Sequence, residues 1–240
     1  MLDFNPRTYQ RLRLPNGGVP CPAISYRQAL FPPQRLPVGG WNGARKRMLD
    51  LVVGLAVLVV AALPMLVLAV LIRLDSPGPA LFRQTGTGLD GKTFRVLKFR
   101  TMHHAACEPE HCRQARRNDP RVTRLGAWMR RTSWDELPQI LNVLAGQMSL
   151  VGPRPHAAGS RAGDRLFEDV TQRYAARHRV KPGMTGLAQI RGLRGETDTE
   201  DKLIRRVEAD LEYIETWSIG LDIAIIWRTI RSLHRLPNAH

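Results

Sequence analysis

The chain has 240 residues, a formal net charge of +15 at pH 7 and a sequence pI near 11.0. A surface this basic predicts anionic partners, but charge alone does not choose among nucleic acid, acidic lipids and phosphorylated small molecules. The three cysteines exclude a disulfide framework of the kind that stabilises small secreted domains. The length allows one compact domain with appendages.

The first 44 residues are typical of a basic tail. They contain seven prolines, five glycines and five arginines but a single acid, and they show no periodic apolar pattern. Such a segment cannot bury enough apolar surface to fold. We therefore predict a disordered tail over residues 1–44.

An uncharged run of 22 residues follows, from Leu51 to Ile72. As a helix it would extend about 33 Å at roughly 1.5 Å per residue, which is long enough to cross a bilayer. The run has no polar face, and a domain of this size could hardly surround it as a core helix. We predict a membrane helix over residues 45–75.

The flanks of this helix leave its topology open. Arg45, Lys46 and Arg47 precede the run and Arg73 follows it, and basic flanks favour the cytoplasm. Pro64 removes a helical hydrogen bond past the middle of the run and predicts a break there. A re-entrant hairpin satisfies both features, whereas a kinked single span is an alternative that membrane helices tolerate.

Residues 76–235 are predicted to form a cytoplasmic catalytic domain. Two short strands are expected at 80–84 and 93–99, with a turn at Asp90-Gly91 between them. Helical patterns then follow after Asp119-Pro120, at 137–144, at 199–217 and from 221 onward. The last helix combines isoleucines with a tryptophan and arginines, a mixture that suits either a membrane interface or the core.

A cluster of possible metal ligands comprises His103, His104, Cys107, His111 and Cys112. A structural zinc site usually joins two ligand pairs across a folded spacer. These side chains instead share one short polar stretch. We interpret the stretch as a solvated loop, with a metal site as the alternative.

The acid pair Asp135 and Glu136 precedes an apolar helical stripe and admits a purely structural interpretation. Ser133 with Glu136 three residues later forms a capping box, and acids stabilise the positive end of a helix. Pro138 weakens this interpretation, because it fits the first helical turn best if the cap moves to Asp135.

The functional interpretation of the same pair is phosphoryl transfer. Arg130, Arg131 and Arg154 would keep Asp135 and Glu136 ionised. Phosphoryl transfer needs positioning and charge neutralisation, arginines bind phosphate oxygens in a bidentate manner, and Mg²⁺ prefers carboxylate and phosphate oxygens. The turns at 151–155 and 181–186 could also hold phosphate, although glycine and proline mark ordinary turns in most proteins.

Five segments occur together and in a fixed order. They are KFRTM at 98–102, NDPRVT at 118–123, the run with DELPQ at 130–144, MSLVGPRP at 148–155 and KPG at 181–183. In this combination the chain resembles the bacterial sugar transferase family, the monotopic polyprenyl-phosphate phosphoglycosyl transferases, over roughly residues 45 to 232. Their joint occurrence is specific where each segment alone is not.

The resemblance implies a helix-rich α/β fold on the cytoplasmic face of the inner membrane. Its expected parts are a re-entrant helix broken at Pro64, a small sheet and interfacial amphipathic helices. Leu63 departs from the serine that precedes this proline in small family members. The larger members of the hexose 1-phosphate branch also have additional membrane helices and a soluble domain upstream.

The resemblance also implies a reaction. Asp135 would attack the sugar-bearing phosphate of a UDP-sugar, UMP would leave, and undecaprenyl phosphate would accept the sugar phosphate from Asp135. Glu136 would hold Mg²⁺. The residues expected to bind substrate phosphates are Arg130, Arg154, Lys98, Arg100 and Lys181.

Residues 194–199 resemble the branch of the family that transfers hexose 1-phosphates and initiates exopolysaccharide or O-antigen synthesis, with UDP-glucose the first choice of donor and UDP-galactose the second. We expect the lipid bilayer but no nucleic acid as a partner, and a homodimer is compatible with the sequence. The alternatives are a membrane-tethered nucleic-acid-binding protein and a scaffold. The former predicts aromatic stacking groups on a basic face, whereas aromatic residues make up only 6% of the chain.

Overall fold

The computed structural model describes residues 40–104, 119–157, 159–193, 195, 197 and 199–233. Almost all of the predicted tail lies outside these residues. So do Cys107, His111 and Cys112 of the histidine and cysteine cluster, and residues 194, 196 and 198 of the branch-specific segment.

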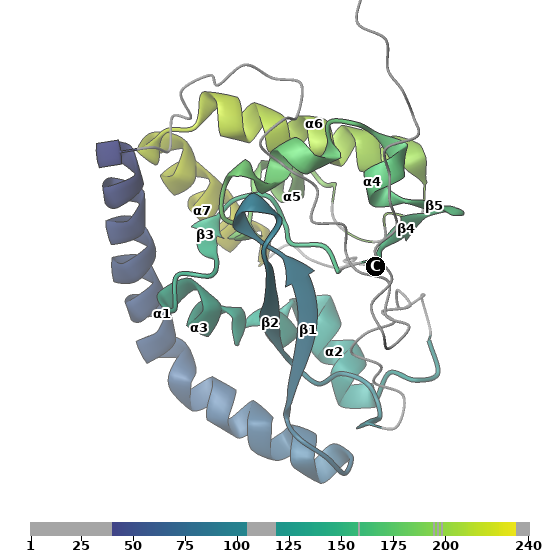
Figure 1. The fold of residues 1–240 in the computed structure, drawn as a ribbon. Coiled ribbons are helices and arrows are strands. Elements are labelled where there is room, and N and C mark those ends of the chain that lie inside the picture. The colour runs from purple at the N-terminus through teal and green to yellow at the C-terminus, as the bar shows by residue number, and fades with distance from the viewer. Residues whose placement is uncertain are drawn as a thin grey trace, which may run out of the picture.

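The first described element is the long apolar helix α1 (Gly40–Asp75), which borders one side of the molecule (Figure 1). Within the described residues it is the one helix long and apolar enough to cross a membrane. It begins at Gly40, before the expected residue 45. The helix continues through Pro64 and bends instead of breaking, because a proline interrupts one helical hydrogen bond without ending the helix.

Both ends of α1 are attached to the globular domain. Near the start of the helix, Lys46 Nζ donates hydrogen bonds to Val151 O at 3.0 Å and to Asp222 Oδ2 at 2.7 Å. At the end, the Arg100 guanidinium donates to the carbonyl oxygens of Ile72 at 3.1 Å and Ser76 at 2.6 Å. The two ends of the helix therefore contact the same domain.

The main sheet is the hairpin of β1 (Leu81–Thr87) and β2 (Thr93–Phe99), paired from Leu81↔Phe99 to Thr87↔Thr93. A short 3-10 turn, η2 (Leu89–Gly91), joins them, and Asp90 adopts the left-handed region at φ 53°. Asp tolerates this region better than most residues. The predicted strands and turn are confirmed.

Two shorter strand pairs complete the small β content. Strand β3 (Ser149–Val151) pairs in parallel with β6 (Gly183–Thr185), and β4 (Arg161–Ala162) pairs with β5 (Arg165–Leu166). Gly152 and Gly183 lie back to back next to the first pair. A Cβ on Gly183 would approach Gly152 N to 2.1 Å, so only glycine fits there.

The remaining helices surround these strands. They are α2 (Arg124–Thr132), η4 (Trp134–Glu136), α3 (Gln139–Leu144), α4 (Phe167–Val170), η5 (Tyr174–Arg179), α5 (Leu187–Ile190), α6 (Glu200–Thr216) and α7 (Ile219–Leu233). Thr199 caps α6, and its hydroxyl accepts a hydrogen bond from Lys202 N. The helix expected after Asp119 begins at Arg124, and the one expected at 137 begins at Gln139. A helix-rich α/β fold with a small sheet is confirmed.

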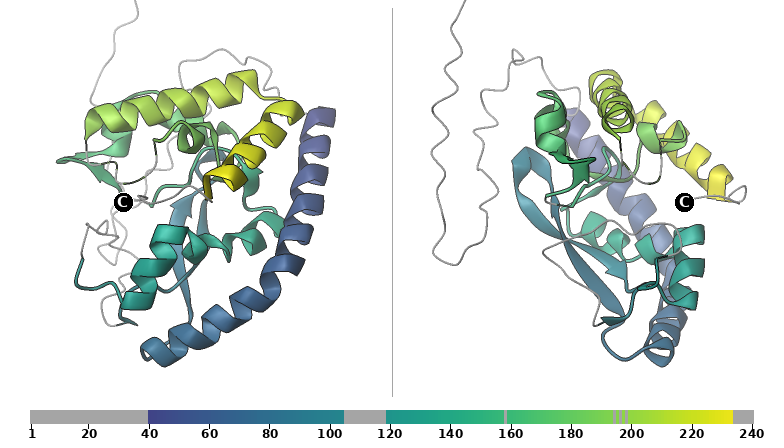
Figure 2. Two further views of the ribbon diagram at one scale, coloured as in Figure 1. Left: turned by 180° about the vertical axis from the view of Figure 1, so that it is seen from behind. Right: turned by 90° about the vertical axis from the view of Figure 1, so that its right-hand side faces the viewer.

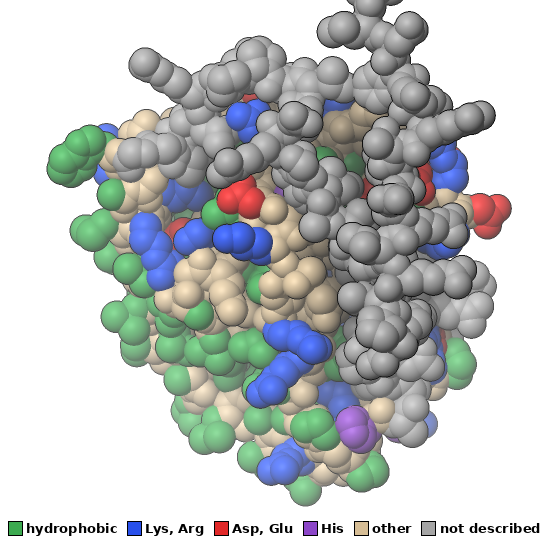
Figure 3. Space-filling model, viewed as in Figure 1, with side chains coloured by type: hydrophobic (Ala, Val, Ile, Leu, Met, Phe, Trp, Pro, Cys, Tyr) green, Lys and Arg blue, Asp and Glu red, His purple; other side chains and the backbone are tan. Residues whose placement is uncertain are grey.

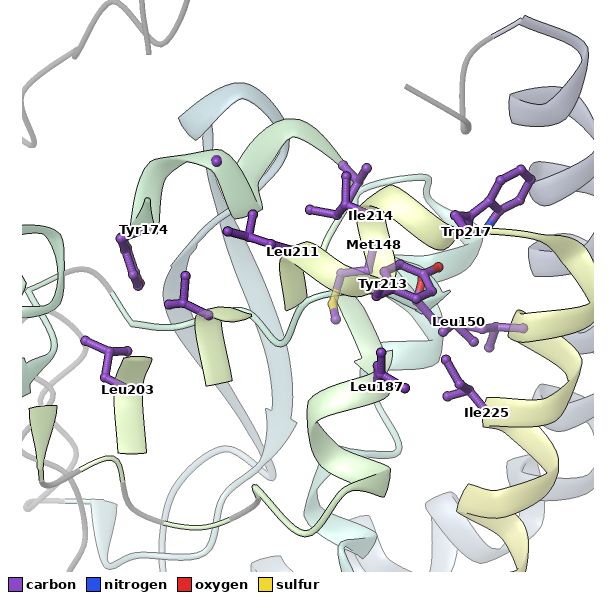
Figure 4. Packing of buried hydrophobic residues seen from close by; sticks show 14 of the residues in the cluster. Met148, Leu150, Tyr174, Leu187, Leu203, Leu211, Tyr213, Ile214, Trp217 and Ile225 are labelled. Carbon is purple, nitrogen blue, oxygen red and sulfur yellow. The ribbon is translucent and has the colours of Figure 1, made fainter. Parts of the chain in front are cut away.

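The principal core lies between α5, α6, α7 and strand β3. Figure 4 shows Leu187, Leu211 and Ile225 converging with Met148 from different elements. Figure 2 shows α6 along one end of the molecule, with the start of α7 near the start of α1. A second, smaller core joins α1 to α2 through Leu68, Ile72 and Met129.

Large apolar side chains are exposed along α1 and α7. Val60 is 78% exposed on α1, and Trp227 is 59% exposed on α7. Hydrophobic atoms accumulate along the edge formed by α1 in Figure 3. Because a stripe of this extent is unusual on a protein surrounded by water, it is consistent with membrane association. Ile225 on α7 is fully buried, so that helix contacts the core with one side and leaves another side exposed.

Candidate active site

The acid pair lies in the tight connection between α2 and α3. Ser133 ends α2 in the left-handed region at φ 58°, and its side chain forms no capping hydrogen bond. Asp135 and Glu136 then form the 3-10 turn η4 before α3 begins at Gln139. The capping box is therefore absent, although both acids do lie in the first turn of η4.

Glu136 is held by two cations from other segments. The Arg154 guanidinium binds it in a bidentate manner, with Nη1 donating to Oε2 at 2.9 Å and Nη2 donating to Oε1. Lys98 Nζ, from β2, lies 3.5 Å from Oε1. Residues far apart in the chain thus meet at this carboxylate.

The two carboxyl groups have opposite pKa shifts. Burial and the neighbouring charge of Glu136 raise the pKa of Asp135 to about 6, against the effect of Lys98, Arg130 and Arg154. Burial would also raise the pKa of Glu136, but Arg154 and Lys98 outweigh it and hold that pKa well below its usual range. Glu136 is therefore ionised throughout the physiological range, whereas Asp135 titrates just below it.

The raised pKa of Asp135 predicts an acid limb in the pH profile. As the nucleophile that the family resemblance implies, Asp135 would attack phosphorus as the carboxylate, which is lost as the pH falls through about 6. Below that pH we expect the rate of UMP release to fall about tenfold per pH unit. The measurement is the burst of UMP without lipid acceptor. The acceptor is left out because it is a phosphate monoester, which itself titrates near roughly pH 6 and would obscure the titration of Asp135. A flat profile through this range would contradict the assignment.

Arg130 lies beside Asp135 and is oriented by Thr101, two residues after the end of β2. Its Nε donates to Thr101 Oγ1 at 2.8 Å, and its charge lowers the pKa of Asp135. Of the five predicted phosphate-binding residues, the structure brings together Arg130, Arg154 and Lys98 around the acid pair.

Arg100 and Lys181 lie elsewhere, so the structure does not bring them together with the other three predicted phosphate-binding residues. Arg100 is only 3% exposed, and its guanidinium is bound to the carbonyl groups at the end of α1. Lys181 lies beside Arg47 and Asp50 of α1, and burial with the nearby arginine lowers its pKa. The Arg100 guanidinium is thus held at the end of α1, and Lys181 lies beside the first half of that helix.

The glycine-containing turns are also structural. Gly152 N donates to Thr185 O at 2.9 Å, and Gly183 N donates to Pro153 O at 2.9 Å. These N–H groups extend the pairing of β3 with β6 and are unavailable to a phosphate. The contribution of the turn at 151–155 is to project Arg154 toward Glu136.

A buried network supports the backbone of Arg154. Arg177, which is 1% exposed, donates to Arg154 O at 2.7 Å and to Asp210 Oδ2 at 2.6 Å. His156 Nδ1 lies 2.9 Å from the Tyr174 hydroxyl in the same network. Sequence reasoning missed these residues. One available signal was the acid at position 210, which interrupts the apolar face of α6 next to Leu211.

The described residues include no group of three or more metal-binding side chains. Mg²⁺ commonly takes one or two carboxylates and completes its octahedral shell with waters and substrate phosphates. The oxygens of Asp135 and Glu136 fit that partial donor set. A metal at this site therefore depends on phosphate oxygens from the substrate.

Comparisons with known proteins agree with this arrangement. A family model described as bacterial sugar transferase matches residues 41–235. The undecaprenyl-phosphate glucose phosphotransferase of Komagataeibacter xylinus is 52% identical over 198 residues, which are 82% of this chain and 37% of that protein.

Several relatives bear the name UDP-glucose:undecaprenyl-phosphate glucose-1-phosphate transferase, two of them from the following organisms. The protein of Caulobacter vibrioides is 53% identical over 197 residues, covering 82% of this chain and 72% of the relative. The Escherichia coli protein is 48% identical over 194 residues, covering 81% of this chain and 41% of the relative. The chain thus spans about two fifths of the length of two of these three relatives. Because the family model matches most of the chain, this protein belongs to the bacterial sugar transferase family.

Proposed function

We propose that this protein transfers a hexose 1-phosphate from a UDP-hexose to undecaprenyl phosphate and releases UMP. The observation that carries the proposal is the different environment of the two carboxylates in the acid pair. Glu136 is neutralised by Arg154 and Lys98, whereas among the described residues no donor binds the Asp135 carboxylate. Asp135 is therefore available as a nucleophile. The Caulobacter vibrioides and Escherichia coli relatives are named for UDP-glucose, which makes it the first donor to test.

The reaction proceeds in two displacements. A carboxylate oxygen of Asp135 attacks the β-phosphorus of the donor, the bond from this phosphorus to the bridging oxygen breaks, and UMP leaves with the electron pair. A phosphate oxygen of the lipid acceptor then attacks the same phosphorus, and the Asp135 carboxylate leaves. Dividing the transfer in this way separates one difficult step into two easier ones.

The charges around the acid pair suit this reaction. Arg154 and Lys98 leave one positive charge in excess over Glu136, and Arg130 adds another beside Asp135. These groups oppose the negative charge that accumulates on the transferred phosphoryl group. Glu136 and the substrate phosphates would hold Mg²⁺, which would supply further positive charge against the phosphate groups.

We further propose that α1 is re-entrant and that the protein lies on the cytoplasmic face of the inner membrane. Lys46 and Arg100 attach the two ends of α1 to one globular domain, which supports placing both ends on one side of the bilayer. The bend at Pro64 would lie at the deepest point. The exposed face of α7, with Trp227 and Arg228, would lie along the membrane interface.

The turnover assay uses the full chain in detergent micelles with UDP-glucose and undecaprenyl phosphate. We expect continuous UMP release with acceptor, and a burst of at most one UMP per chain without it, because Asp135 would remain occupied. UDP-galactose is the second donor to assay. Failure of both donors to yield UMP in the complete reaction would contradict the proposed function.

The topology is tested with single cysteines at the exposed positions 45 and 75 in a variant whose three native cysteines are replaced by serine. Both Arg45→Cys and Asp75→Cys are expected to resist an impermeant thiol reagent in spheroplasts and to react after the membrane is opened. Glu212→Cys, on the exposed surface of α6, is the cytoplasmic reference. Labelling of only one position in intact spheroplasts would show a single span.

A further inference from the structure

A small polar pocket lies next to the residues that bind Glu136. Its walls include Gln84 from β1, Lys98 from β2, Gln139 from α3, and Arg154 and His156 from the segment after β3. Lys98 and Arg154 are the two cations that bind Glu136. The pocket therefore shares two residues with the proposed site of phosphoryl transfer but lies beside it.

Gln139 contributes to the lining of this pocket a buried amide whose oxygen lacks a hydrogen-bond partner. Its side chain lies in the first turn of α3 and is 1% exposed, yet Oε1 has no hydrogen-bond partner. A buried amide without a partner is unfavourable, and such groups are rare unless a water or ligand completes them. We therefore expect a hydrogen-bonding group from outside the protein to occupy the pocket.

The size of the pocket restricts this group. The centre of a water-sized sphere can move within about 10 Å³, which is close to the space that one water needs. A uracil ring and a whole phosphate group are too large for this enclosed part of the pocket, whose mouth is open. A single hydroxyl fits, and it can satisfy either end of an amide because it both donates and accepts a hydrogen bond.

We propose that this pocket binds one hydroxyl group of the transferred hexose, with Gln139 as its principal hydrogen-bonding partner and Gln84 as a second. This inference rests on the proposed function. The hexose is bonded to the phosphoryl group that Asp135 attacks, and Lys98 and Arg154 border both that site and the pocket. A hydroxyl there reproduces the hydrogen bonds of a water that it displaces, so the exchange preserves them.

The test combines removal of the protein group with removal of the substrate group. The full chain and its Gln139→Met variant are assayed with UDP-glucose and with its 2-, 3-, 4- and 6-deoxy analogues. Methionine keeps the volume of glutamine and removes the amide. We expect Gln139→Met to lower kcat/KM for UDP-glucose roughly 10- to 100-fold, the range for a buried polar group left unpaired.

With the unmodified chain, kcat/KM for one deoxy analogue should be lower than for UDP-glucose by a similar factor. For that analogue alone, Gln139→Met should lower kcat/KM little further. A glutamine that only stabilises the fold would give equal losses with all five donors, and that result would overturn the inference. An unchanged kcat/KM for UDP-glucose would overturn it as well.

Gln84→Leu, on the half-buried opposite wall, provides a second variant if Gln139→Met does not fold. Gln84→Leu should likewise cause little further loss of kcat/KM for the same deoxy analogue. Equal losses of kcat/KM with all donors would again overturn the inference. Absence of UMP release by the unmodified chain would refute the proposed function itself. Equal losses across the donor series would refute only the hydroxyl pocket.

Discussion

Replacement of Asp135 with Asn is expected to lower kcat for UMP release by roughly 10³-fold or more, the scale of loss when a covalent nucleophile is removed. The amide has nearly the same shape but cannot attack phosphorus. The half-buried position of Asp135 and the absence of a bound donor among its described neighbours indicate that the fold tolerates the change. The measurement is steady-state UMP release with UDP-glucose and undecaprenyl phosphate.

A second readout follows the transferred group. With a donor labelled in its β-phosphate and no lipid acceptor, the unmodified chain should retain the label, and Asp135→Asn should not. Asp201→Asn makes the same chemical change at an exposed position of α6 and should retain both full turnover and labelling. Labelling of Asp135→Asn to the level of the unmodified chain would assign the nucleophile to another residue.

Replacement of Asp210 with Ala is expected to destabilise the fold by about 3–5 kcal/mol, because it leaves the Arg177 charge buried without its carboxylate. The side chains of this pair are 1% and 2% exposed, and the Nη2 to Oδ2 distance is 2.6 Å. For a domain of this size the melting temperature should fall by roughly 10 °C. Thermal unfolding in detergent micelles measures the change.

Glu212 provides the matched control two residues further along α6. It pairs with Arg191, but the side chains of this pair are 45% and 47% exposed. Because water solvates both partners, Glu212→Ala should cost less than about 1 kcal/mol. If the two substitutions lowered the free energy of unfolding equally, burial of the Arg177–Asp210 pair would not determine its contribution to stability.

Elements defined by nearby residues could be predicted from the sequence. The uncharged run from Leu51 to Ile72 is helical, and α6 lies within the expected residues 199–217, with Thr199 as its cap. The hairpin turns at Asp90 as expected. In each case the signal is periodicity or a capping residue, which acts over a few positions of the chain.

The choice among basic residues could not be made in this way. Lys98 and Arg100 are two positions apart, a spacing that would place both side chains on the same face of a regular strand, but β2 ends at Phe99 and Arg100 lies beyond it. Lys98 reaches Glu136, whereas Arg100 binds the end of α1. The family motif contains both residues without distinguishing these roles.

The sequence by itself determined the long apolar helix, the identity of the acid pair and the family, because these depend on composition and short motifs. Only the tertiary structure decided which cations meet that pair, that Ser133 forms no cap, and that Gln139, whose buried Oε1 has no hydrogen-bond partner, lines a small pocket. The physical reason is distance along the chain. Contacts such as Lys46 with Asp222 depend on how separate elements pack, and local periodicity contains no information about that packing.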